Sequence, residues 1–451
     1  MQRCVSLLLL AALGAAACSE PVPPTPDVVL VVLDTWRTDA LTYRSGAPSR
    51  APFLDRMAEE GAVFPNAFAT SSWTAPSTAS LLTGTYPDRH GVQQGFLAQM
   101  RHAGGYGNKV TVDELRLSRI SDATRTLPQL MKDRGYRTYG IATNINIGQE
   151  MGFDRGFDRF RRESEWPAAR VAKLLGDWRA EIVEGEGPFF LYLHLNDVHK
   201  PYDLRKKWFQ PGQPGHPPEL ANYMSEVGYL DHHLEAMLTG LPLEEDTLLV
   251  VVSDHGEEFL DHGGMGHHFT LYNEVNGIVF LFRAPGLGVE AVRLEGVEAG
   301  GIDLAPTVLQ LAGFAPPTEE QDGVGLAPFF KAGTAREVLE DTRQKLAGRA
   351  LYAHRWGNDR NLYATVQEGW KLIEGPGEFG RKLFHVAEDP YERNDLAETH
   401  PERVAELAQR LEEYLARDYV PVTSSQSVDM DPELLEQLKM LGYVEGDVEA
   451  E

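Results

Sequence analysis

The chain has 451 residues, of which 42% are hydrophobic and 24% are charged, a composition typical of a globular protein with a substantial core. Its 42 basic and 67 acidic side chains give a formal net charge of −25. This charge argues against nucleic acid as a partner, because nucleic-acid binding needs a positive surface. It does not exclude an anionic substrate, because a bound metal ion can reverse the local field.

The first residues have the pattern of an export signal. A basic residue precedes an apolar run over residues 5–13, which is too short to span a membrane, and small residues then lead to Cys18. Residues 1–18 are predicted to be a bacterial lipoprotein-type signal peptide, with Cys18 as the lipid anchor and residues 19–26 as a proline-rich tether. A secretory signal cleaved near Ala17 is the alternative. Both interpretations place the protein in the bacterial periplasm or cell envelope.

Both cysteines of the chain lie in this leader. The domain that follows is therefore expected to contain no disulfide and no thiolate metal site.

Apolar runs and amphipathic segments alternate along residues 27–347, the range assigned to a catalytic domain. Continuous apolar runs predict buried strands of a parallel sheet, with helices between them. This alternation implies an α/β layered domain with functional groups at the C-terminal ends of its strands. The predicted strands are residues 27–34, 136–143, 188–195, 247–254 and 277–283, and the predicted helices are residues 51–60, 77–82 and 127–134.

From about residue 348 the pattern changes to short strands followed by one long helix. Residues 348–422 are predicted to form a smaller α+β subdomain, and residues 423–451 a tail with an acidic end. The short strands are predicted at residues 350–353, 362–365 and 370–373, and the helix at residues 401–417.

Acidic and histidine side chains follow three of the predicted strands. Asp34 ends the first strand, Asp197 and His199 follow another, and Asp254 and His255 follow a third. A buried carboxylate without a partner is costly, and a divalent cation would satisfy several of these groups at once. For one aspartate alone, a cap or loop role is the simpler explanation. Three such strand ends together predict a metal site.

Thr74 stands at the start of a predicted helix in the stretch SWTAPSTASLLTG. Pro76 suits the first helical position, and Gly84 is a natural C-terminal stop. The positive end of the helix dipole meets a hydroxyl at this point. Thr74 is therefore either a helix cap or a nucleophile.

Several further segments occur in an order that resembles a known family. They are TAPSTASLLTGTYPDRHGV, NDVHKPY, SDHGEEFLDHG, GHHFTLYNE, IDLAPTVLQLAG and LFHVAEDPYERNDLAETHPE. From about residue 27 to residue 443 the chain resembles the sulfatase-like branch of the alkaline phosphatase superfamily. The resemblance implies a central mixed sheet sandwiched by helices, with a smaller C-terminal α+β subdomain. It also implies a metal-dependent hydrolase or transferase that acts on anionic esters.

The chain departs from true sulfatases at positions that handle sulfate. Those enzymes carry Cys or Ser in the motif C/S-x-P-x-R, which is oxidised to formylglycine, whereas Thr74 and Thr78 stand at the nucleophile and arginine positions here. Threonine cannot form this aldehyde, because oxidation of its secondary alcohol gives a ketone. Thr35 replaces a second aspartate, and the family's Lys-x-His motif is absent from residues 141–144. No formylglycine is therefore expected.

The remaining set of Asp34, Thr74, Asp254 and His255 is similar to the single-metal site of threonine-dependent relatives. Those relatives include phosphoethanolamine transferases, lipoteichoic acid synthases and some phosphodiesterases. The resemblance implies one divalent ion, and a roughly tetrahedral shell favours Zn²⁺ over Mn²⁺ or Ca²⁺. It also implies a metal-activated Thr74 that forms a phosphothreonine intermediate.

Other residues are candidates for supporting roles. His199 is assigned to proton transfer at the leaving oxygen, with a satisfied loop histidine as the alternative. His267 is also assigned to catalysis, because it or His268 takes the place of a sulfatase lysine. His268, Lys200 and Asp197 are candidates for substrate binding, although the last two can also serve only to orient or neutralise His199. Two residues just beyond Asp34, Arg37 and Asp39, are expected to be loop and cap residues.

The predicted function is a sulfatase-family hydrolase or phosphotransferase that acts on phosphate monoesters or diesters through Thr74. One alternative is a sulfuric ester hydrolase that uses threonine without formylglycine. Another is a catalytically inactive binding protein on the same scaffold. The expected partners are an anionic ester substrate and, through Cys18 alone, a membrane.

Overall fold

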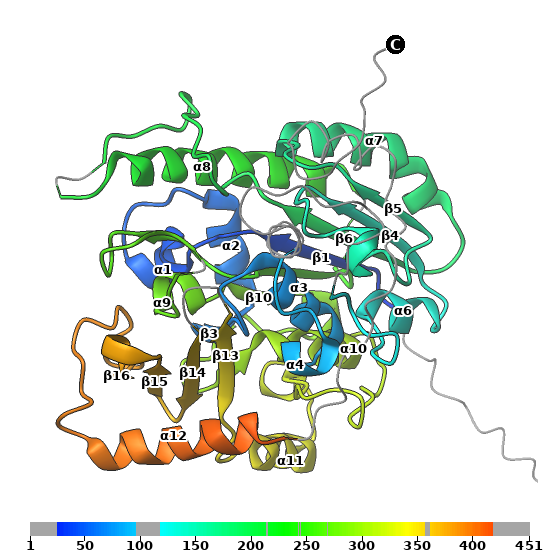
Figure 1. Ribbon diagram of the computed structural model, residues 1–451. Coiled ribbons are helices and arrows are strands. Elements are labelled where there is room, and N and C mark those ends of the chain that lie inside the picture. The colour runs from blue at the N-terminus through cyan, green and yellow to red at the C-terminus, as the bar shows by residue number, and fades with distance from the viewer. Residues whose placement is uncertain are drawn as a thin grey trace, which may run out of the picture.

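The computed structural model describes residues 25–95, 118–212, 215–241, 243, 245–267, 269–356 and 361–417. Its centre is an eight-stranded mixed sheet, which confirms the predicted α/β class. In spatial order the strands are β11 (Val292–Arg293), β2 (Ala62–Val63), β10 (Phe280–Arg283), β7 (Leu248–Ser253), β1 (Val28–Leu33), β6 (Phe189–Leu195), β4 (Arg137–Ala142) and β5 (Arg159–Arg162) (Figure 1).

Strand β1 lies between two parallel neighbours, β6 and β7, so three of the predicted strand ends meet at one edge of the sheet. The register pairs Leu33 with Leu195 and with Ser253. The residues that follow these three strands therefore start from the same level of the sheet. Strand β10 was also predicted, and it runs antiparallel to β7.

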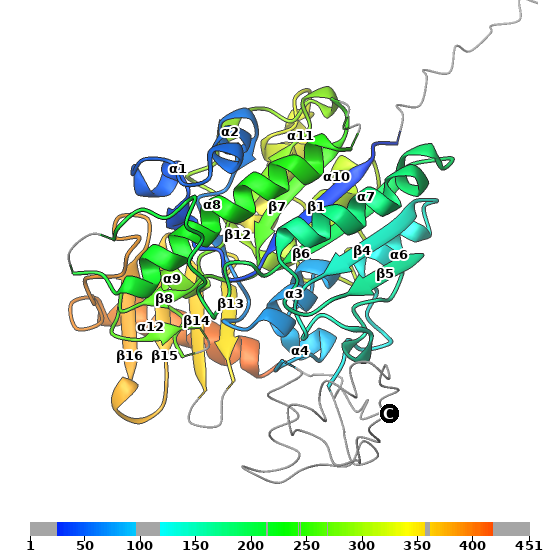
Figure 2. The same cartoon turned by 90° about the horizontal axis from the view of Figure 1, so that it is seen from above.

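The sheet is buried on both faces by helices. Val28 and alternate residues of β1 pack into one core, and Val29 and its alternate neighbours pack into the other. Each fully buried valine or leucine contributes about 1.5–3 kcal/mol of hydrophobic free energy. One face is covered by α3 (Thr74–Thr83), α6 (Leu127–Lys132) and α10 (Leu304–Leu311), and the other by α2 (Pro52–Glu60), α7 (Ala168–Glu184) and α8 (Pro218–Thr239) (Figures 1 and 2).

Helices α7 and α8 are long elements that the sequence reading did not predict. The buried face of α7 is formed by Val171, Leu175, Trp178 and Ile182, which have the spacing of an amphipathic helix. The pattern is therefore present in the sequence. Helix α7 begins at Ala168, whose backbone N–H is bound by the carboxylate of Asp197.

A smaller antiparallel sheet follows the central one, as the predicted C-terminal subdomain requires. Helix α12 (Pro401–Leu415) packs against it through Leu407, Leu411 and Tyr414 (Figure 1). The last strand of this sheet was not predicted. The strands are β13 (Leu351–Arg355), β14 (Leu362–Gln367), β15 (Trp370–Glu374) and β16 (Arg381–His385).

Several predicted segments lie outside the described residues, namely the signal peptide with Cys18, most of the tether and the tail. The boundaries at residues 347 and 422 remain predictions. Within the described ranges, no helix is both long and apolar enough to cross a bilayer. The shorter elements are α1 (Thr42–Ser45), β3 (Asn66–Phe68), α4 (Pro87–His90), β8 (Glu258–Phe259), β9 (Met265–Gly266), α9 (Asn273–Asn276), β12 (Glu298–Gly300) and α11 (Arg336–Leu346).

Candidate metal centre and active site

Helix α3 begins at Thr74, two residues before the proline that the sequence reading placed first. Trp73 is the N-cap, so Thr74 is the first helical residue, and no side chain caps this end of the helix. Gly84 ends the helix in the left-handed region with a φ of 68°, as predicted. The Thr74 hydroxyl is therefore directed to partners outside the helix.

Those partners come from the ends of two strands. Thr74 Oγ1 lies 3.5 Å from Asp34 Oδ1 and 3.3 Å from His255 Nε2. Nε2 of His255 lies 3.8 Å from Asp34 Oδ1 and 3.7 Å from Asp254 Oδ2. Thr74 is 4% exposed, and the other three residues are fully buried. The structure thus brings together the four residues that the sequence proposed as metal ligands.

The donor set suits a divalent cation. Four ligands about 2.0–2.1 Å from a tetrahedral zinc ion lie roughly 3.3 Å from one another, and the separations here are 3.3–3.8 Å. Within the described residues, Asp254 Oδ2 is buried without a hydrogen bond. Burial and the charge of Asp254 raise the pKa of Asp34. Two adjacent buried carboxylates of this kind call for positive charge between them.

His255 is held in the tautomer that a metal ligand needs. Its Nδ1 lies 2.9 Å from the carbonyl oxygen of Gly256, which can only accept a hydrogen bond. The proton therefore sits on Nδ1, and the lone pair of Nε2 faces Asp34 and Asp254. His255 follows the carboxyl end of β7 by two residues, and its Nε2 lies 3.3 Å from Oγ1 of Thr74, the first residue of α3.

His194 belongs to the same cluster and was missed by the sequence reading. Its Nε2 lies 3.9 Å from Asp254 Oδ2 and 3.5 Å from the Thr78 hydroxyl. Ligand atoms of Asp34, His194 and Asp254 all lie within 4.8 Å of one another. The sequence feature that could have identified His194 is its place near the end of the apolar strand FFLYLHL. Its side chain lies on the face of the sheet that packs against α3. Thr78 thus offers a neutral hydroxyl where the resemblance implies an arginine.

The backbone beside Asp34 is strained and carries a functional hydrogen bond. Thr35 has a φ of 54°, a region that β-branched residues rarely adopt. In this conformation its N–H donates to Asp254 Oδ1 at 3.2 Å. The hydroxyl of Tyr223, on α8, donates to the Thr35 carbonyl at 3.0 Å. Helix α8 therefore helps to hold the strand end that carries Asp34.

Asn144, another residue that the sequence reading did not select, orients Asp34. Its Nδ2 donates to Asp34 Oδ2 at 2.5 Å. Its Oδ1 accepts the backbone N–H of Asn146 at 2.8 Å and the side-chain amide of Asn146 at 3.0 Å. Because a backbone N–H can only donate, the orientation of the Asn144 amide is determined.

Replacement of Asn144 by alanine is expected to weaken binding of Zn²⁺ by about 10–100-fold, because Asp34 loses the donor that holds its second oxygen. Asn146→Ala is the matched control. It removes only one of the two donors to Asn144, so its effect should be below about threefold. Calorimetric titration of the chelator-treated proteins with Zn²⁺ measures both. Equal affinities for the two variants would contradict the role assigned to Asn144.

Two further histidines extend the cluster away from Thr74. The ring of His267 lies 4.7 Å from that of His255 and 4.9 Å from that of His199. Nδ1 of His267 is 2.9 Å from Glu257 Oε1, and Nδ1 of His199 is 2.7 Å from the Lys200 carbonyl oxygen. Both partners accept hydrogen bonds, so Nε2 is the nitrogen that each ring uses to exchange a proton. Burial and the neighbouring His255 and His199 hold the pKa of His267 well below its usual value.

The residues proposed for substrate binding are less closely grouped. Asp197 Oδ1 accepts the backbone N–H of Ala168 at 2.8 Å, and burial raises the pKa of Asp197 to about 6. This hydrogen bond therefore stabilises the start of α7. Lys200 is exposed and contributes its carbonyl oxygen to His199. His268 lies outside the described residues.

The chain is similar in sequence and in fold to known proteins. A family model described as Sulfatase matches residues 26–314. N-acetylgalactosamine-6-sulfatase of Canis lupus familiaris is 26% identical over 460 residues, covering 87% of this chain and 85% of that protein. The multifunctional alkaline phosphatase superfamily protein PehA of Trinickia caryophylli is 25% identical, covering 82% of this chain and 91% of that protein. The phosphonate monoester hydrolase structure of Agrobacterium radiobacter superposes with a TM-score of 0.66 at 18% identity, covering 87% and 95% of the two chains.

Proposed function

Because this chain belongs to the sulfatase family of hydrolases, we propose that it hydrolyses phosphate esters with Thr74 as the nucleophile. One observation carries the proposal: the Thr74 hydroxyl lies between Asp34 and His255, at the position where the resemblance implies formylglycine. The similarity to a phosphonate monoester hydrolase and to a multifunctional phosphatase-superfamily protein supports phosphorus as the reacting centre.

In the first step Thr74 Oγ1 attacks phosphorus, so that an oxygen–phosphorus bond forms and the bond to the leaving alcohol breaks. The proton that Thr74 loses is balanced by the proton that the leaving oxygen gains. Asp34 Oδ1 at 3.5 Å and His255 Nε2 at 3.3 Å are the acceptors that lie nearest to Thr74 Oγ1 among the measured contacts, and the carboxylate is the one assigned to take the proton. His199 Nε2 is the candidate donor to the leaving oxygen, whereas the lowered pKa of His267 leaves its Nε2 without a proton and suits it to accept one. The amino-terminal end of α3 stabilises the phosphoryl oxygens through its dipole and backbone N–H groups.

In the second step water attacks the phosphothreonine, and His267 or His199 takes up its proton. Thr74 is regenerated and the phosphate product leaves. An alcohol in place of water gives phosphotransfer by the same route. The residues that would hold the cation are Asp34, Asp254 and His255, with His194 beside them, and two carboxylates with imidazole favour Zn²⁺ over Mn²⁺ or Ca²⁺. When bound, such a cation lowers the pKa of a neighbouring hydroxyl and offsets phosphoryl charge.

Sulfate is the weaker candidate substrate for a chemical reason. A sulfate ester of threonine has no second oxygen on its carbon from which the sulfate could be expelled. Its release would require attack of water at sulfur. A sulfuric ester hydrolase that uses threonine therefore remains the second candidate, supported by similarity to N-acetylgalactosamine-6-sulfatase.

A panel of 4-nitrophenyl esters tests the proposal. We expect kcat/KM for the phosphate monoester, the phosphate diester or the phenylphosphonate to exceed that for the sulfate by at least about 100-fold, or about 2.7 kcal/mol in the transition state. Thr74→Ala serves as the background control for each ester. A preference for the sulfate ester that is lost in Thr74→Ala would overturn the choice of phosphorus and favour the second candidate.

We also propose that the protein is exported and held at the membrane by a lipid on Cys18. The support is the leader pattern alone, and residues 1–24 lie outside the described residues. Incorporation of labelled palmitate into the wild-type chain, but not into Cys18→Ala, is the measurement that checks this anchor.

A further inference from the structure

Arg37 is a buried arginine that uses every donor it has. Its Nε and one Nη bind the two oxygens of Asp39 at 2.9 and 2.8 Å. Its two Nη atoms bind the two oxygens of Asp261 at 2.7 and 3.1 Å, and one of them binds the Glu257 carbonyl oxygen at 2.9 Å. An arginine has five N–H donors, and these five acceptors match them one to one. The side chain is only 6% exposed.

Arg37 makes more contacts than the loop or cap role that the sequence led us to expect. Arg37 follows Asp34 by three residues, and the carbonyl that it binds belongs to the segment just after His255. The guanidinium therefore connects the two strand ends that carry the metal ligands. Lysine cannot replace it, because a single ammonium group cannot form two bidentate pairs and a bond to a carbonyl oxygen.

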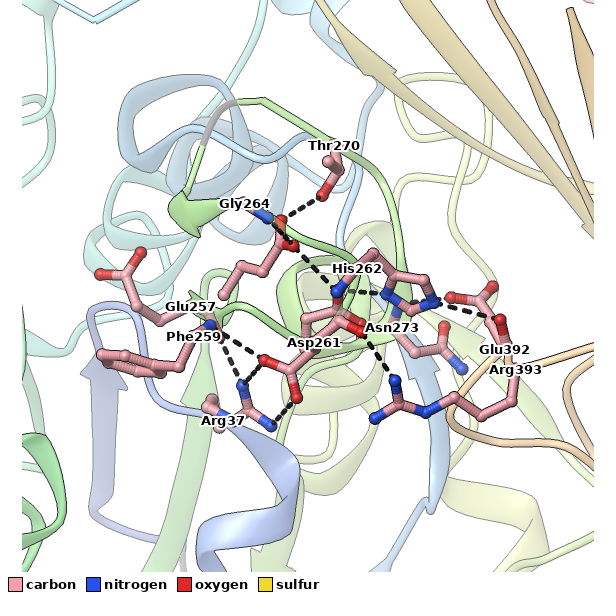
Figure 3. Close-up of polar contacts among 12 residues, drawn as sticks. Arg37, Glu257, Phe259, Asp261, His262, Gly264, Thr270, Asn273, Glu392 and Arg393 are labelled. Carbon is pink, nitrogen blue, oxygen red and sulfur yellow. Dashed lines mark hydrogen bonds and ion pairs between the residues drawn. The ribbon is translucent and has the colours of Figure 1, made fainter. Parts of the chain in front are cut away.

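The segment that Arg37 binds contains Glu257, the hydrogen-bond partner of the candidate catalytic residue His267. The Glu257 carbonyl is bound by Arg37, and the Glu257 side chain binds His267 Nδ1. Figure 3 shows Glu257 and Asp261 on the same loop, with Arg37 reaching both. Glu257 is fully buried, so its side chain has little freedom once its backbone is held.

The other side of this loop is fastened to the C-terminal subdomain. His262 Nδ1 lies 2.7 Å from Glu274 Oε1, and its Nε2 lies 3.1 Å from the Glu392 carbonyl oxygen. Arg393 donates to the Asp261 carbonyl oxygen at 2.6 Å (Figure 3). Arg37 therefore ties the loop to the residues that follow β1, whereas Glu392 and Arg393 tie it to the subdomain and Glu274 ties it to α9.

The geometry assigns Arg37 as a positioning residue that sets the imidazole of His267 through Glu257. This assignment rests on the proposed function in one respect, namely that His267 Nε2 takes up the proton of the water that attacks the phosphothreonine. The contact chain runs from the Arg37 guanidinium to the Glu257 carbonyl, and from the Glu257 carboxylate to His267. Loss of the first contact lets Glu257 shift, and His267 then loses its orientation and its tautomer.

Arg37→Lys tests this role, with Arg349→Lys as the matched control. Arg349 is half-buried, binds both oxygens of Asp303 at 2.7 and 2.8 Å, and donates to the Glu298 carbonyl at 3.3 Å. The two variants therefore lose the same kinds of contact, but no measured contact joins Arg349 to the Glu257 loop. Comparison of their melting temperatures separates a general loss of stability from a local effect.

The first readout needs no substrate. In protein labelled with ¹⁵N-histidine, the Nδ1–H signal of His267, assigned by its absence from His267→Gln, should be lost or shifted in Arg37→Lys and unchanged in Arg349→Lys. The second readout separates the two chemical steps with 4-nitrophenyl phosphate. We expect Arg37→Lys to change the rate of the first turnover less than about threefold and to lower the steady-state kcat about 10–100-fold, because His267 acts as a base only when water attacks the phosphothreonine.

Two results would overturn the assignment. One is an unchanged His267 signal in Arg37→Lys, and the other is an equal loss in the first turnover and in the steady-state kcat, which indicates a merely structural role. If no phosphate ester is turned over by the wild type, the proposed function fails while the nuclear magnetic resonance test still decides the role of Arg37. If Arg37→Lys does not fold, Asp261→Asn, which removes one charged partner of Arg37, must shift the His267 signal in the same direction.

Discussion

Thr74→Ala is expected to abolish turnover, with kcat reduced on the order of 10⁴–10⁶-fold, because no other group can form the covalent intermediate. The hydroxyl lies 3.5 Å from Asp34 Oδ1 and 3.3 Å from His255 Nε2 at the first residue of α3. Alanine leaves the helix and its buried neighbours in place. The variant should therefore keep the melting temperature of the wild type to within a few degrees.

Two companion variants sharpen this result. Thr83→Ala removes another buried hydroxyl from α3, one that bonds the Ala79 carbonyl at 2.7 Å, and it should retain full activity. Thr74→Ser keeps a hydroxyl and should retain activity within about 100-fold. Rapid quenching of the wild type with substrate, followed by peptide mass spectrometry, should detect a phosphoryl group on the peptide that contains Thr74. Turnover by Thr74→Ala at more than a few per cent of the wild-type rate would exclude Thr74 as the nucleophile.

Asp254→Asn is expected to remove the metal site and, unusually, to stabilise the metal-free protein. Burial and the charge of Asp254 raise the pKa of Asp34, so a second negative charge in this buried site is disfavoured, although the imidazoles of His255 and His194 lower the pKa of Asp254. Asparagine can still accept the N–H groups of Thr35 and His255, which Asp254 Oδ1 binds at 3.2 and 2.8 Å. The free energy of unfolding without metal should rise by about 1–3 kcal/mol, and the melting temperature by about 1–4 °C.

Zn²⁺ should stabilise only the wild type, because Asp254→Asn lacks the metal site. At about 100 times its Kd, Zn²⁺ should stabilise the wild type by about 2.7 kcal/mol and have no effect on Asp254→Asn. Chelation should reduce wild-type activity on the order of 10³-fold, and added Zn²⁺ should restore it. If Asp254→Asn melts at a lower temperature than the wild type in chelator, the protein stabilises the charge of Asp254 without a cation, and the prediction is wrong. Asp231→Asn, which replaces another buried carboxylate that binds the N–H groups of Phe53 and Leu54, is the control, and its effect on stability should be the same with and without Zn²⁺.

The central strands were predictable because their signal is local. Each of β1, β6 and β7 is a short continuous apolar run, and burial on both faces of a parallel sheet requires that composition. The smaller sheet was foreseen except for β16, whose five residues include two lysine or arginine side chains at its exposed start. The start of α3 was placed two residues late, because Pro76 suits the third helical position as well as the first.

Some residues of the candidate site could likewise be predicted from the sequence, and others could not. Asp34, Thr74, Asp254 and His255 were selected from their positions after apolar runs and within motifs, and those features are readable along the chain. His194 and Asn144 were not, because a histidine within a strand and an asparagine in a loop have no distinctive pattern. Their importance arises from contacts with Asp254 and Asp34 across the sheet.

The residue types and their order along the chain therefore determine the sheet class, the family and the acids and histidines available for chemistry. The folded arrangement alone decides which of them meet. Thr74 and His255 are 181 positions apart, and Asn144 and Asp34 are 110 positions apart. Their separations of 3.3 and 2.5 Å follow from strand register and helix packing, which depend on the whole core rather than on any local run of residues. The same holds for Arg37, whose neighbours in sequence suggest a loop residue and whose neighbours in space make it the link between two strand ends.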